Sequence, residues 1–437
     1  MEAVTAVSKE LQEVPGRLKV ARNGSTDTYA LQWPPADLHL AAMLGLFDLQ
    51  PFPTATRCLP QLPDDLAPTP PVPIPSIPPN EWDFSSFLVP EGPLCRGGEA
   101  LIWMGGQVYI NRLRKIQRRR TTIKILRPEI YPDPQERLEA FSWEASCFAF
   151  LSRWGISPEL YGIGRAFGCH DALVMEQFDA SLFTFSRMAK SHPDLWKKTL
   201  GNVGFIAAFI FQILHLALGI QRRFQNKTVF GDYKPSNFLI KLPPFHPLSL
   251  KDFYLPSMSF YEKLKKMISH FSLGAKNLPL VKLTDFNGLT HVGRHSQRTM
   301  TPNYSPPEVL IALAAGNTEV ERDLPDDPFA IATVLFELLT GDYLFSPSTL
   351  PSCQRTIDEM RSPKRPSLCG TLANKGLPPR HVAHYRDFDP IIQKATSPEK
   401  DHRYASMEAM VRDAREKVPF LRNRWTKLET LFPHLVA

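Results

Sequence analysis

The hydrophobic pattern changes along the chain, from short strand-like runs to long helical ones. In FSSFLVPEGPLCRGGEALIWMGGQVYI, residues 84–110, short apolar runs separated by glycines predict a strand, a turn and a second strand. The β-branched residues of RRRTTIKIL, residues 118–126, predict a third strand, and DALVMEQF, residues 171–178, predicts another. The first part of the chain should therefore contain a sheet.

A helix is predicted between these strands, from about Asp133 to Trp154, because the segment opens with Asp and Pro and is followed by Gly155. Glu144 falls on the apolar face of this helix, and a carboxylate buried there needs a partner because an unpaired buried charge is strongly destabilising. The apolar residues of that face recur at the helical period and are Leu138, Phe141, Ala145 and Phe148.

From Leu182 onward the pattern is mostly helical. The most apolar stretch, LGNVGFIAAFIFQILHLALGI at residues 200–220, is long enough to cross a membrane. Gln212 and His215 interrupt it, and a helix that is apolar on all sides also fits the core of a large domain, so we expect a core helix and no transmembrane segment. A small strand-rich half followed by a larger helical half predicts an α+β fold with two lobes.

The length and composition of the chain indicate how it is divided into domains. The chain has 437 residues, of which 43% are hydrophobic and 22% charged, and this is ordinary for a globular protein with a large core. Its 42 prolines are unevenly spread, and the proline-rich run FPTATRCLPQLPDDLAPTPPVPIPSIPP predicts an extended linker. The predicted parts are an N-terminal extension at 1–50 with a helix in ADLHLAAMLGLFDL, a proline-rich linker at 51–80, a first lobe at 85–178 and a second lobe at 179–437.

Net charge and cysteine content indicate which kinds of binding partner and which cellular compartment to expect. The net charge of +7 is mild, and the basic run RLRKIQRRR, residues 112–120, favours a solvated loop or strand edge over nucleic-acid binding. Six widely spaced cysteines with no C-x-x-C pair predict neither a zinc site nor a disulfide framework. The start of the sequence lacks the apolar region of a secretory signal, so we expect an intracellular protein, cytoplasmic or nuclear.

Residues 241–280 form a predicted insertion in the second lobe. Within it FYEKLKKMISHF, residues 260–271, predicts a basic amphipathic helix. Such a helix can bind an anionic membrane or a protein partner, or dock on its own domain, and the last alternative is favoured. This helix and the proline-rich segment are the two predicted sites for a protein partner.

Four short motifs occur in a fixed order: TTIKIL at 121–126, FGDYKPSN at 230–237, VKLTDFNGL at 281–289 and TPNYSPPEV at 301–309. In this order they resemble the protein kinase family, and the resemblance extends from about Leu94 to Ala414. It implies a two-lobed kinase-like fold, with a small β-rich N-lobe and a larger helical C-lobe. It also implies that ATP and Mg²⁺ are the cofactors.

The resemblance assigns nucleotide-binding roles in the first lobe. Lys124 matches the lysine that contacts the ATP phosphates, and Glu144 matches its ion-pair partner. LCRGGEALI resembles the glycine-rich loop with two of its glycines replaced, and ALVMEQF resembles the hinge strand, whose backbone groups bind adenine. The implied nucleotide-binding residues are Gly97, Gly98, Ala100, Ile102, Lys124, Glu144, Met175 as gatekeeper, Glu176 and Phe178.

In the second lobe the resemblance makes Asp232 the residue that orients the substrate hydroxyl and Lys234 the one that steadies the transferring phosphoryl group. Asn237 and Asp285 would bind magnesium, which prefers oxygen ligands. Asn287 replaces a family glycine, and since Asn tolerates positive φ, we expect the turn to survive there.

Three further matches imply structural roles. Glu308 of TPNYSPPEV and Arg403 of ATSPEKDHRYAS would form a buried ion pair. Asp327 opens a helix that resembles the family's D-x-W-S-x-G helix. Gly231 replaces an arginine that in many relatives pairs with a phosphorylated activation loop, so we expect that phosphorylation of Thr299 or Thr301 is not the switch.

These residues predict an ATP-dependent protein kinase that phosphorylates serine or threonine of protein substrates, because a lysine two positions after Asp232 is the serine/threonine pattern. The alternative is a catalytically weak or inactive pseudokinase that acts as a scaffold or regulator. A small-molecule kinase is a further alternative, since relatives of that class often carry a Gly-Asp pair like that of Gly231 and Asp232. The last alternative is an interaction protein that uses the kinase-like fold only as a platform.

Overall fold

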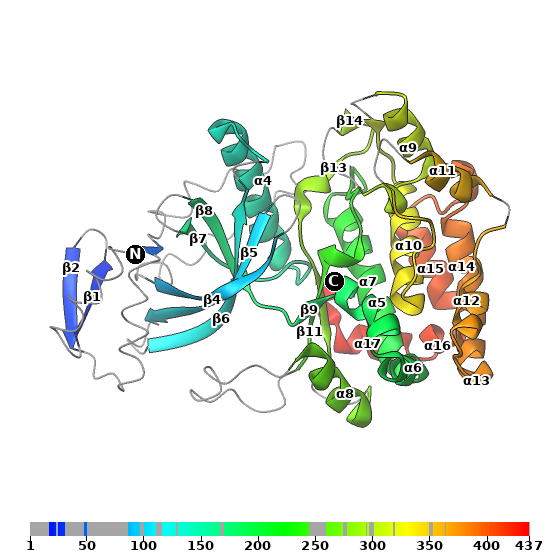
Figure 1. Cartoon of the computed structure of the whole chain (residues 1–437), viewed down its shortest axis with the longest axis horizontal. Helices are drawn as coiled ribbons and strands as arrows, with labels where there is room; N and C mark the ends of the chain where they lie inside the picture. Colours follow the sequence, from blue (N-terminus) through cyan, green and yellow to red (C-terminus); the bar gives the residue numbers. More distant parts are fainter. Residues whose placement is uncertain are drawn as a thin grey trace. The chain divides into compact units, whose positions relative to one another are not determined.

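The computed structural model describes two compact units of the chain, shown in Figure 1. The first contains the described residues up to Arg153 together with Pro158–Gln177, and the second contains Trp154–Ser157 and the described residues from Phe178 onward. The described residues are 17–22, 25–30, 48–49, 86–96, 100–110, 116–127, 130–166, 170–243, 259–273, 278–293, 295–296, 301–317, 320–348, 353–362 and 364–436.

The first unit is built on a six-stranded antiparallel sheet with the strand order β3-β4-β5-β6-β8-β7. One helix, α4 (Pro134–Ser152), contacts β7 of this sheet. A separate hairpin is formed by β1 (Arg17–Arg22) and β2 (Ser25–Ala30). The strands of the sheet are β3 (Asp48–Leu49), β4 (Ser86–Arg96), β5 (Ala100–Ile110), β6 (Ile116–Leu126), β7 (Leu160–Ala166) and β8 (His170–Glu176).

The two faces of strand β6 differ: one carries apolar side chains and the other carries Lys124. Ile123 and Ile125 pack with Ala172 and Val174 of β8 in one apolar cluster. Side chains alternate between the two faces of a strand, so Lys124 points to the face opposite these isoleucines. The sequence therefore places a lysine in the middle of a buried strand without placing it in the apolar cluster.

Helix α4 agrees with the predicted helix to within two residues at its C-terminal end. Phe141, Ala145 and Phe148 of its predicted apolar face are buried, and Glu144 is buried completely. Leu138 lies on the same helix, but its side chain is outside the described ones. The helix thus brings one carboxylate into the interior of the first unit.

The N-terminal predictions fall mainly outside the described residues. The proline-rich linker at 51–80 and most of the predicted helix at 36–49 lie there. The last two residues of that helix, Asp48 and Leu49, instead form β3, paired with Phe87 and Ser86 of β4, so the helix prediction is wrong at its end. Of the basic run at 112–120, the described residues 116–120 form part of β6 and pair with β5.

The second unit is largely helical, with a small sheet in the order β12-β11-β9. The helices α7 (Val203–Arg223) and α10 (Asp326–Thr340) contact each other and form its centre (Figure 1). Its other longer helices are α5 (Leu182–Ser191), α6 (Pro193–Gly201), α8 (Phe260–His270), α9 (Pro307–Ala314), α11 (Gln354–Arg361), α12 (Leu368–Asn374), α14 (Asp389–Ala395), α15 (Met407–Lys417) and α17 (Trp425–Leu431).

Short elements complete the second unit. The four-residue helices are α13 (Pro379–Val382), α16 (Pro419–Arg422) and α18 (Pro433–Val436). The strands are β9 (Ala180–Ser181), β10 (Thr228–Val229), β11 (Phe238–Lys241), β12 (Leu280–Leu283), β13 (Thr290–His291), β14 (His295–Ser296) and β15 (Val320–Glu321). A small strand-rich unit and a larger helical unit confirm the predicted α+β class.

Helix α7 is the described helix that is long and apolar enough to span a membrane, and 83% of its most apolar window is buried inside the protein. The two polar residues that interrupt its apolar stretch make contacts within the second unit. Gln212 donates to the carbonyl of Pro279 and accepts from the N–H of Val281, each at about the length of an ordinary hydrogen bond. His215 stacks on Phe211, and burial lowers its pKa to about 4, so it is neutral at pH 7. These contacts are those of a core helix.

The insertion helix α8 docks on its own unit. Phe260, Leu264, Met267 and Ile268 are buried, so the apolar face is already covered. On the polar side Lys263 forms an ion pair with Asp179 at 2.5 Å. The alternative in which this face binds a membrane or a partner is therefore contradicted, whereas residues 244–258 and 274–277 of the insertion lie outside the described ones.

Candidate active site

In the first unit, Lys124 of β6 and Glu144 of α4 form a buried ion pair. The side chains are 7% and 0% exposed, so both charges are withdrawn from water. Mutual attraction in a low-dielectric interior offsets the cost of removing these charges from water. Lys124 is therefore the partner that the carboxylate of Glu144, on the apolar face of α4, was predicted to need. The ion pair also holds the ammonium group of Lys124 in one position.

The remaining nucleotide-binding predictions of the first unit lie on β5 and β8. Ile102 is directly opposite Lys124 in the β5–β6 register, and Ala100 is buried at the start of β5. Gly97 and Gly98 lie outside the described residues. The structure thus places the described end of the predicted phosphate-covering loop beside the lysine strand.

The predicted hinge residues begin on β8. Met175 is buried and pairs with Thr122 of β6. The N–H of Glu176 donates to the carbonyl of Glu159 at 2.9 Å, so this N–H is used within the first unit rather than offered to a ligand. Phe178 belongs to the second unit, where Lys241 lies over its ring.

In the second unit, the loop from Phe230 to Lys234 presents Asp232 as the centre of a hydrogen-bond network. Lys234 donates to one carboxylate oxygen of Asp232 at 2.6 Å, and the Thr301 hydroxyl donates to the other at 3.1 Å. The side-chain amide of Asn237 donates to the main-chain carbonyl of Asp232 at 3.0 Å. Three residues therefore hold the Asp232 carboxylate and its peptide in one orientation.

The environment of Asp232 changes its acidity. Burial raises the pKa of this carboxyl to about 6, the nearby Lys234 ammonium opposes the rise, and the charge of Asp285 adds to it. A carboxylate with a pKa near 6 is a better proton acceptor than one with an ordinary pKa, and at pH 7 it is still mostly ionised. Asp232 therefore has the electrostatics of a general base.

Asn237 and Asp285 are brought together by strand pairing. Phe238 of β11 pairs with Leu283 of β12, and the N–H of Thr284 donates to the carbonyl of Asn237 at 2.8 Å. Asn237 precedes the first strand and Asp285 follows the second by two residues, so an antiparallel register sets both at the same end of the sheet. Two oxygen-bearing side chains thus flank Asp232.

The turn at residues 285–288 differs from the prediction. Asp285 itself has a φ of 64°, in the left-handed region, whereas Asn287 lies in a short 3₁₀ segment, Phe286–Gly288, and is not among the residues with positive φ. The prediction that Asn287 would supply the positive φ is therefore wrong. Gly288 has a steric role: a Cβ there would lie 2.7 Å from the carbonyl oxygen of Phe230 and 2.8 Å from Cβ of Asp232.

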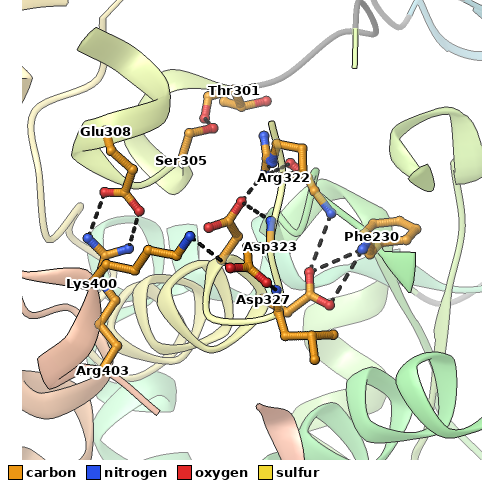
Figure 2. Close-up of polar contacts among 12 residues, drawn as sticks. Phe230, Thr301, Ser305, Glu308, Arg322, Asp323, Asp327, Lys400 and Arg403 are labelled. Carbon is orange, nitrogen blue, oxygen red and sulfur yellow. Dashed lines mark hydrogen bonds and ion pairs between the residues drawn. The ribbon is translucent and has the colours of Figure 1, made fainter. Parts of the chain in front are cut away.

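Asp327 at the start of α10 anchors the loop that carries Asp232. One of its carboxylate oxygens accepts from the N–H of Phe230 at 3.1 Å, a contact drawn in Figure 2, and from the N–H of Gly231 at 3.4 Å. The other oxygen accepts from Gln221 of α7 at 3.1 Å. The side chain is fully buried, and burial raises the pKa of Asp327 to about 7. The carboxylate thus connects the two central helices to the two residues before Asp232.

The TPNYSPPEV segment is fixed by a bidentate ion pair. Arg403 donates to both carboxylate oxygens of Glu308, at 2.7 and 2.8 Å, as Figure 2 shows. Tyr304 of the same segment donates to Glu337 of α10 at 2.5 Å. The Glu308–Arg403 pair predicted from the resemblance is therefore present, but it is only half-buried, because the side chain of Glu308 is 39% exposed. The pair anchors the segment that carries Thr301.

Two contacts of this site were not predicted from the sequence. Thr301 was considered only as a phosphorylation site, but its hydroxyl contacts Asp232. Arg322, which precedes α10, donates to the carbonyl of Gly231 at 3.2 Å. Spacing could not reveal this arginine, because it lies 91 residues from its acceptor and outside every quoted motif.

Neither a protein-family model nor a curated protein matches the sequence. Among solved structures, the chain is similar to the kinase PK-1 of the Cydia pomonella granulovirus, with 14% identity over 76% of this chain and 94% of that one and a TM-score of 0.46. It is also similar to the kinase domain of a rhoptry antigen of Toxoplasma gondii, with 11% identity over 80% of this chain and 84% of that one and a TM-score of 0.47. Both likenesses are distant and concern the fold alone.

The geometry within each unit carries the assignment. The first unit has a lysine strand paired with a helix carboxylate, and the second has an aspartate loop between two central helices and a strand pair that ends in Asn237 and Asp285. The Glu308–Arg403 pair lies where the resemblance requires it. The described residues therefore have a protein-kinase-like α+β fold.

Proposed function

We propose that the protein is an ATP-dependent, magnesium-dependent kinase that phosphorylates serine or threonine residues of protein substrates. The observation that carries the proposal is the arrangement around Asp232, where Lys234, Asn237 and Asp285 converge on one loop of the second unit. The ion pair of Lys124 and Glu144 in the first unit supports it, since phosphoryl transfer needs a fixed cation on the phosphates.

Each residue has a role that its environment suits. Asp232, with its raised pKa, accepts or orients the proton of the attacking hydroxyl. Lys234 lies 2.6 Å from this carboxylate, so its ammonium group is also placed to balance negative charge that develops on the transferring phosphoryl group. Lys124 would hold the phosphate oxygens of ATP. Little covalent chemistry is required, so positioning and charge supply most of the catalysis.

Asn237 and Asp285 fit a magnesium ion of the kind that is shared with a nucleotide. The amide nitrogen of Asn237 is used by Asp232, which leaves the carboxamide oxygen as the ligand atom. Among the described residues, no group of three or more His, Cys, Asp or Glu side chains could hold a metal ion alone. Mg²⁺ commonly takes one or two protein oxygens and completes its shell with phosphates and water, and it would neutralise charge on those phosphates.

A protein substrate is favoured over a small molecule by the segment at 301–308. Thr301 contacts Asp232, and Glu308, seven residues later, is held by Arg403. The segment is therefore fixed at one end beside the proposed base and at the other in the helical core. A rigid surface of this kind next to the base suits a peptide that must present one hydroxyl.

The proposal is tested by Mg²⁺-dependent transfer from radiolabelled ATP to a generic protein substrate. We expect transfer by the wild type, loss of transfer when EDTA removes the metal, and a large loss for Asp285→Asn. Asp358→Asn is the matched control, since Asp358 contacts only Gln354 among its described hydrogen-bond partners and lies on α11. If transfer is missing and ATP with Mg²⁺ also gives no thermal stabilisation, the protein is a platform without nucleotide binding.

The activity should depend on pH through Asp232. The active form is the carboxylate and its pKa is about 6, so kcat/KM should halve near pH 6 and fall roughly tenfold for each further pH unit below it. Lys234 lowers this pKa, so Lys234→Met should move the midpoint to higher pH. The rate is measured from pH 5 to 8 with circular dichroism as the check on folding. A flat profile in a folded protein would exclude Asp232 as the titrating base.

Thr301 should respond differently to removal and to negative charge. Thr301→Ala removes one hydrogen bond to Asp232 and should lower kcat by roughly 10- to 100-fold, as expected for one bond to a charged group. Thr301→Glu places a second carboxylate beside Asp232 and should lower kcat far more. The variants are compared by initial rates at saturating ATP. An active Thr301→Glu variant would contradict both this prediction and the view that phosphorylation there is not an activating switch.

A further inference from the structure

The peptide of Gly231 is held from both sides. Its N–H donates to Asp327 at 3.4 Å, and its carbonyl accepts from the Arg322 guanidinium at 3.2 Å. Gly231 immediately precedes Asp232, and its own residue type replaces the arginine that the kinase resemblance leads one to expect. An arginine from elsewhere in the chain thus reaches the position at which the local arginine is missing.

Arg322 is itself fixed. It is 2% exposed, and its Nε donates to the buried carboxylate of Asp326 at 2.9 Å. Its main-chain carbonyl accepts from the N–H of Gly293 at 2.9 Å, so its backbone is anchored as well. A planar guanidinium can donate in two directions at once, and Arg322 uses this to join Asp326 to Gly231. Figure 2 shows Arg322 close to Asp327 and Phe230.

The glycine and the arginine are matched in space. Gly231 has a φ of 73°, a conformation that glycine adopts without strain. A Cβ at this position would lie 3.3 Å from Nη2 of Arg322 and 3.1 Å from the carbonyl oxygen of Gly288. A larger residue would therefore crowd both the guanidinium and the turn that carries Asp285. The close approach of Arg322 to this peptide therefore depends on residue 231 being a glycine.

We propose that Arg322 is a positioning residue that holds the Gly231–Asp232 peptide in its catalytic geometry and takes the place of an arginine within the loop. This inference rests on the proposed kinase activity. The cation that orders the loop is paired with Asp326 inside the fold, so the loop is ordered without a phosphorylated residue.

The test compares kcat and KM of Arg322→Lys with those of the wild type. A lysine cannot donate to Asp326 and Gly231 in the same geometry, so we expect kcat to fall by about 10- to 100-fold while KM for ATP changes by less than about threefold. Arg355→Lys is the matched control, because Arg355 is an exposed arginine of α11 whose side chain is 80% exposed. Unchanged kcat in Arg322→Lys would overturn the proposal.

A second variant separates positioning from folding. In Arg322→Met combined with Asp326→Asn, the buried charge pair is removed together, and the introduced asparagine can still accept from the N–H of Asp323 as Asp326 does. We expect this variant to fold and to keep the loss of kcat. If it folds and regains wild-type kcat, the contact with Gly231 has no catalytic effect and the proposal fails.

Hydrogen exchange provides a readout that needs no activity. The amides of Phe230, Gly231 and Asp232 should exchange about tenfold faster in Arg322→Lys than in the wild type, because the clamp on this peptide is weakened. Faster exchange in a protein that transfers no phosphate would support the clamp and reject the kinase function. Normal transfer with unchanged exchange and unchanged kcat would reject the clamp alone.

Discussion

Asp232→Asn is expected to lower kcat for phosphoryl transfer by roughly 10²- to 10⁴-fold without unfolding the protein. Asparagine has the same shape and can still accept from Thr301, but it cannot take a proton and it removes the charge that pairs with Lys234. Burial and the charge of Asp285, which raise the pKa of Asp232, are already present without substrate, so the carboxylate suits the proposed proton transfer.

Initial rates of transfer from radiolabelled ATP, at saturating ATP and Mg²⁺, measure this effect. Lys124→Ala is assayed beside Asp232→Asn, because the two residues act on different parts of the reaction: Lys124 on the nucleotide and Asp232 on the substrate hydroxyl. Lys124→Ala removes the cation paired with the buried Glu144 carboxylate and should lower the stability. Thermal unfolding is therefore measured for both variants, and rates are compared at a temperature at which each is folded. Equal transfer by the wild type and both variants would indicate a contaminating kinase and reject the enzymatic function.

Glu144→Ala is expected to destabilise the protein by about 3–5 kcal/mol, because it removes the carboxylate that compensates the buried charge of Lys124. Both side chains of the pair are almost completely buried, so solvent does not replace the lost partner. The double variant Lys124→Met with Glu144→Leu should be close to the wild type in stability or more stable, since apolar residues of similar volume replace the ion pair.

Urea unfolding at pH 7 gives the free energy of unfolding of the three proteins. The same proteins are assayed for transfer, where we expect both variants to be inactive although only Glu144→Ala is unstable. This combination would show that the pair is kept for its effect on the nucleotide and not for stability. A double variant that is active, or as unstable as Glu144→Ala, would contradict this account.

The sequence predicted most where a residue is constrained by its own neighbours. The period of apolar residues located α4 and α7 closely, and a carboxylate on the apolar face of α4 required a partner, which proved to be Lys124. The loop that carries Asp232 could also be predicted from the sequence, because Asp232 and Asn237 are only five residues apart and share a hydrogen bond.

Predictions were weaker where local preference and tertiary contact disagree. Asp48 and Leu49 end an apolar, helix-like run but pair as a strand with β4. Asn287 tolerates positive φ, yet the turn has its positive φ at Asp285, and the next position, Gly288, packs closely against Phe230 and Asp232. The basic amphipathic pattern of α8 was compatible with a membrane, a protein partner or the helix's own domain. Only the burial of its apolar face in the structure shows that it packs on its own unit.

The sequence by itself determined the fold class, the order of the motifs and the residues proposed for the site, since these depend on residue type and short-range spacing. Tertiary structure alone decided what surrounds Asp232: the hydroxyl of Thr301, the carboxylate of Asp327 under the loop and the guanidinium of Arg322 on Gly231. These partners come from positions 69 to 96 residues away. Contacts over such separations form only when the chain is packed, so no local pattern records them.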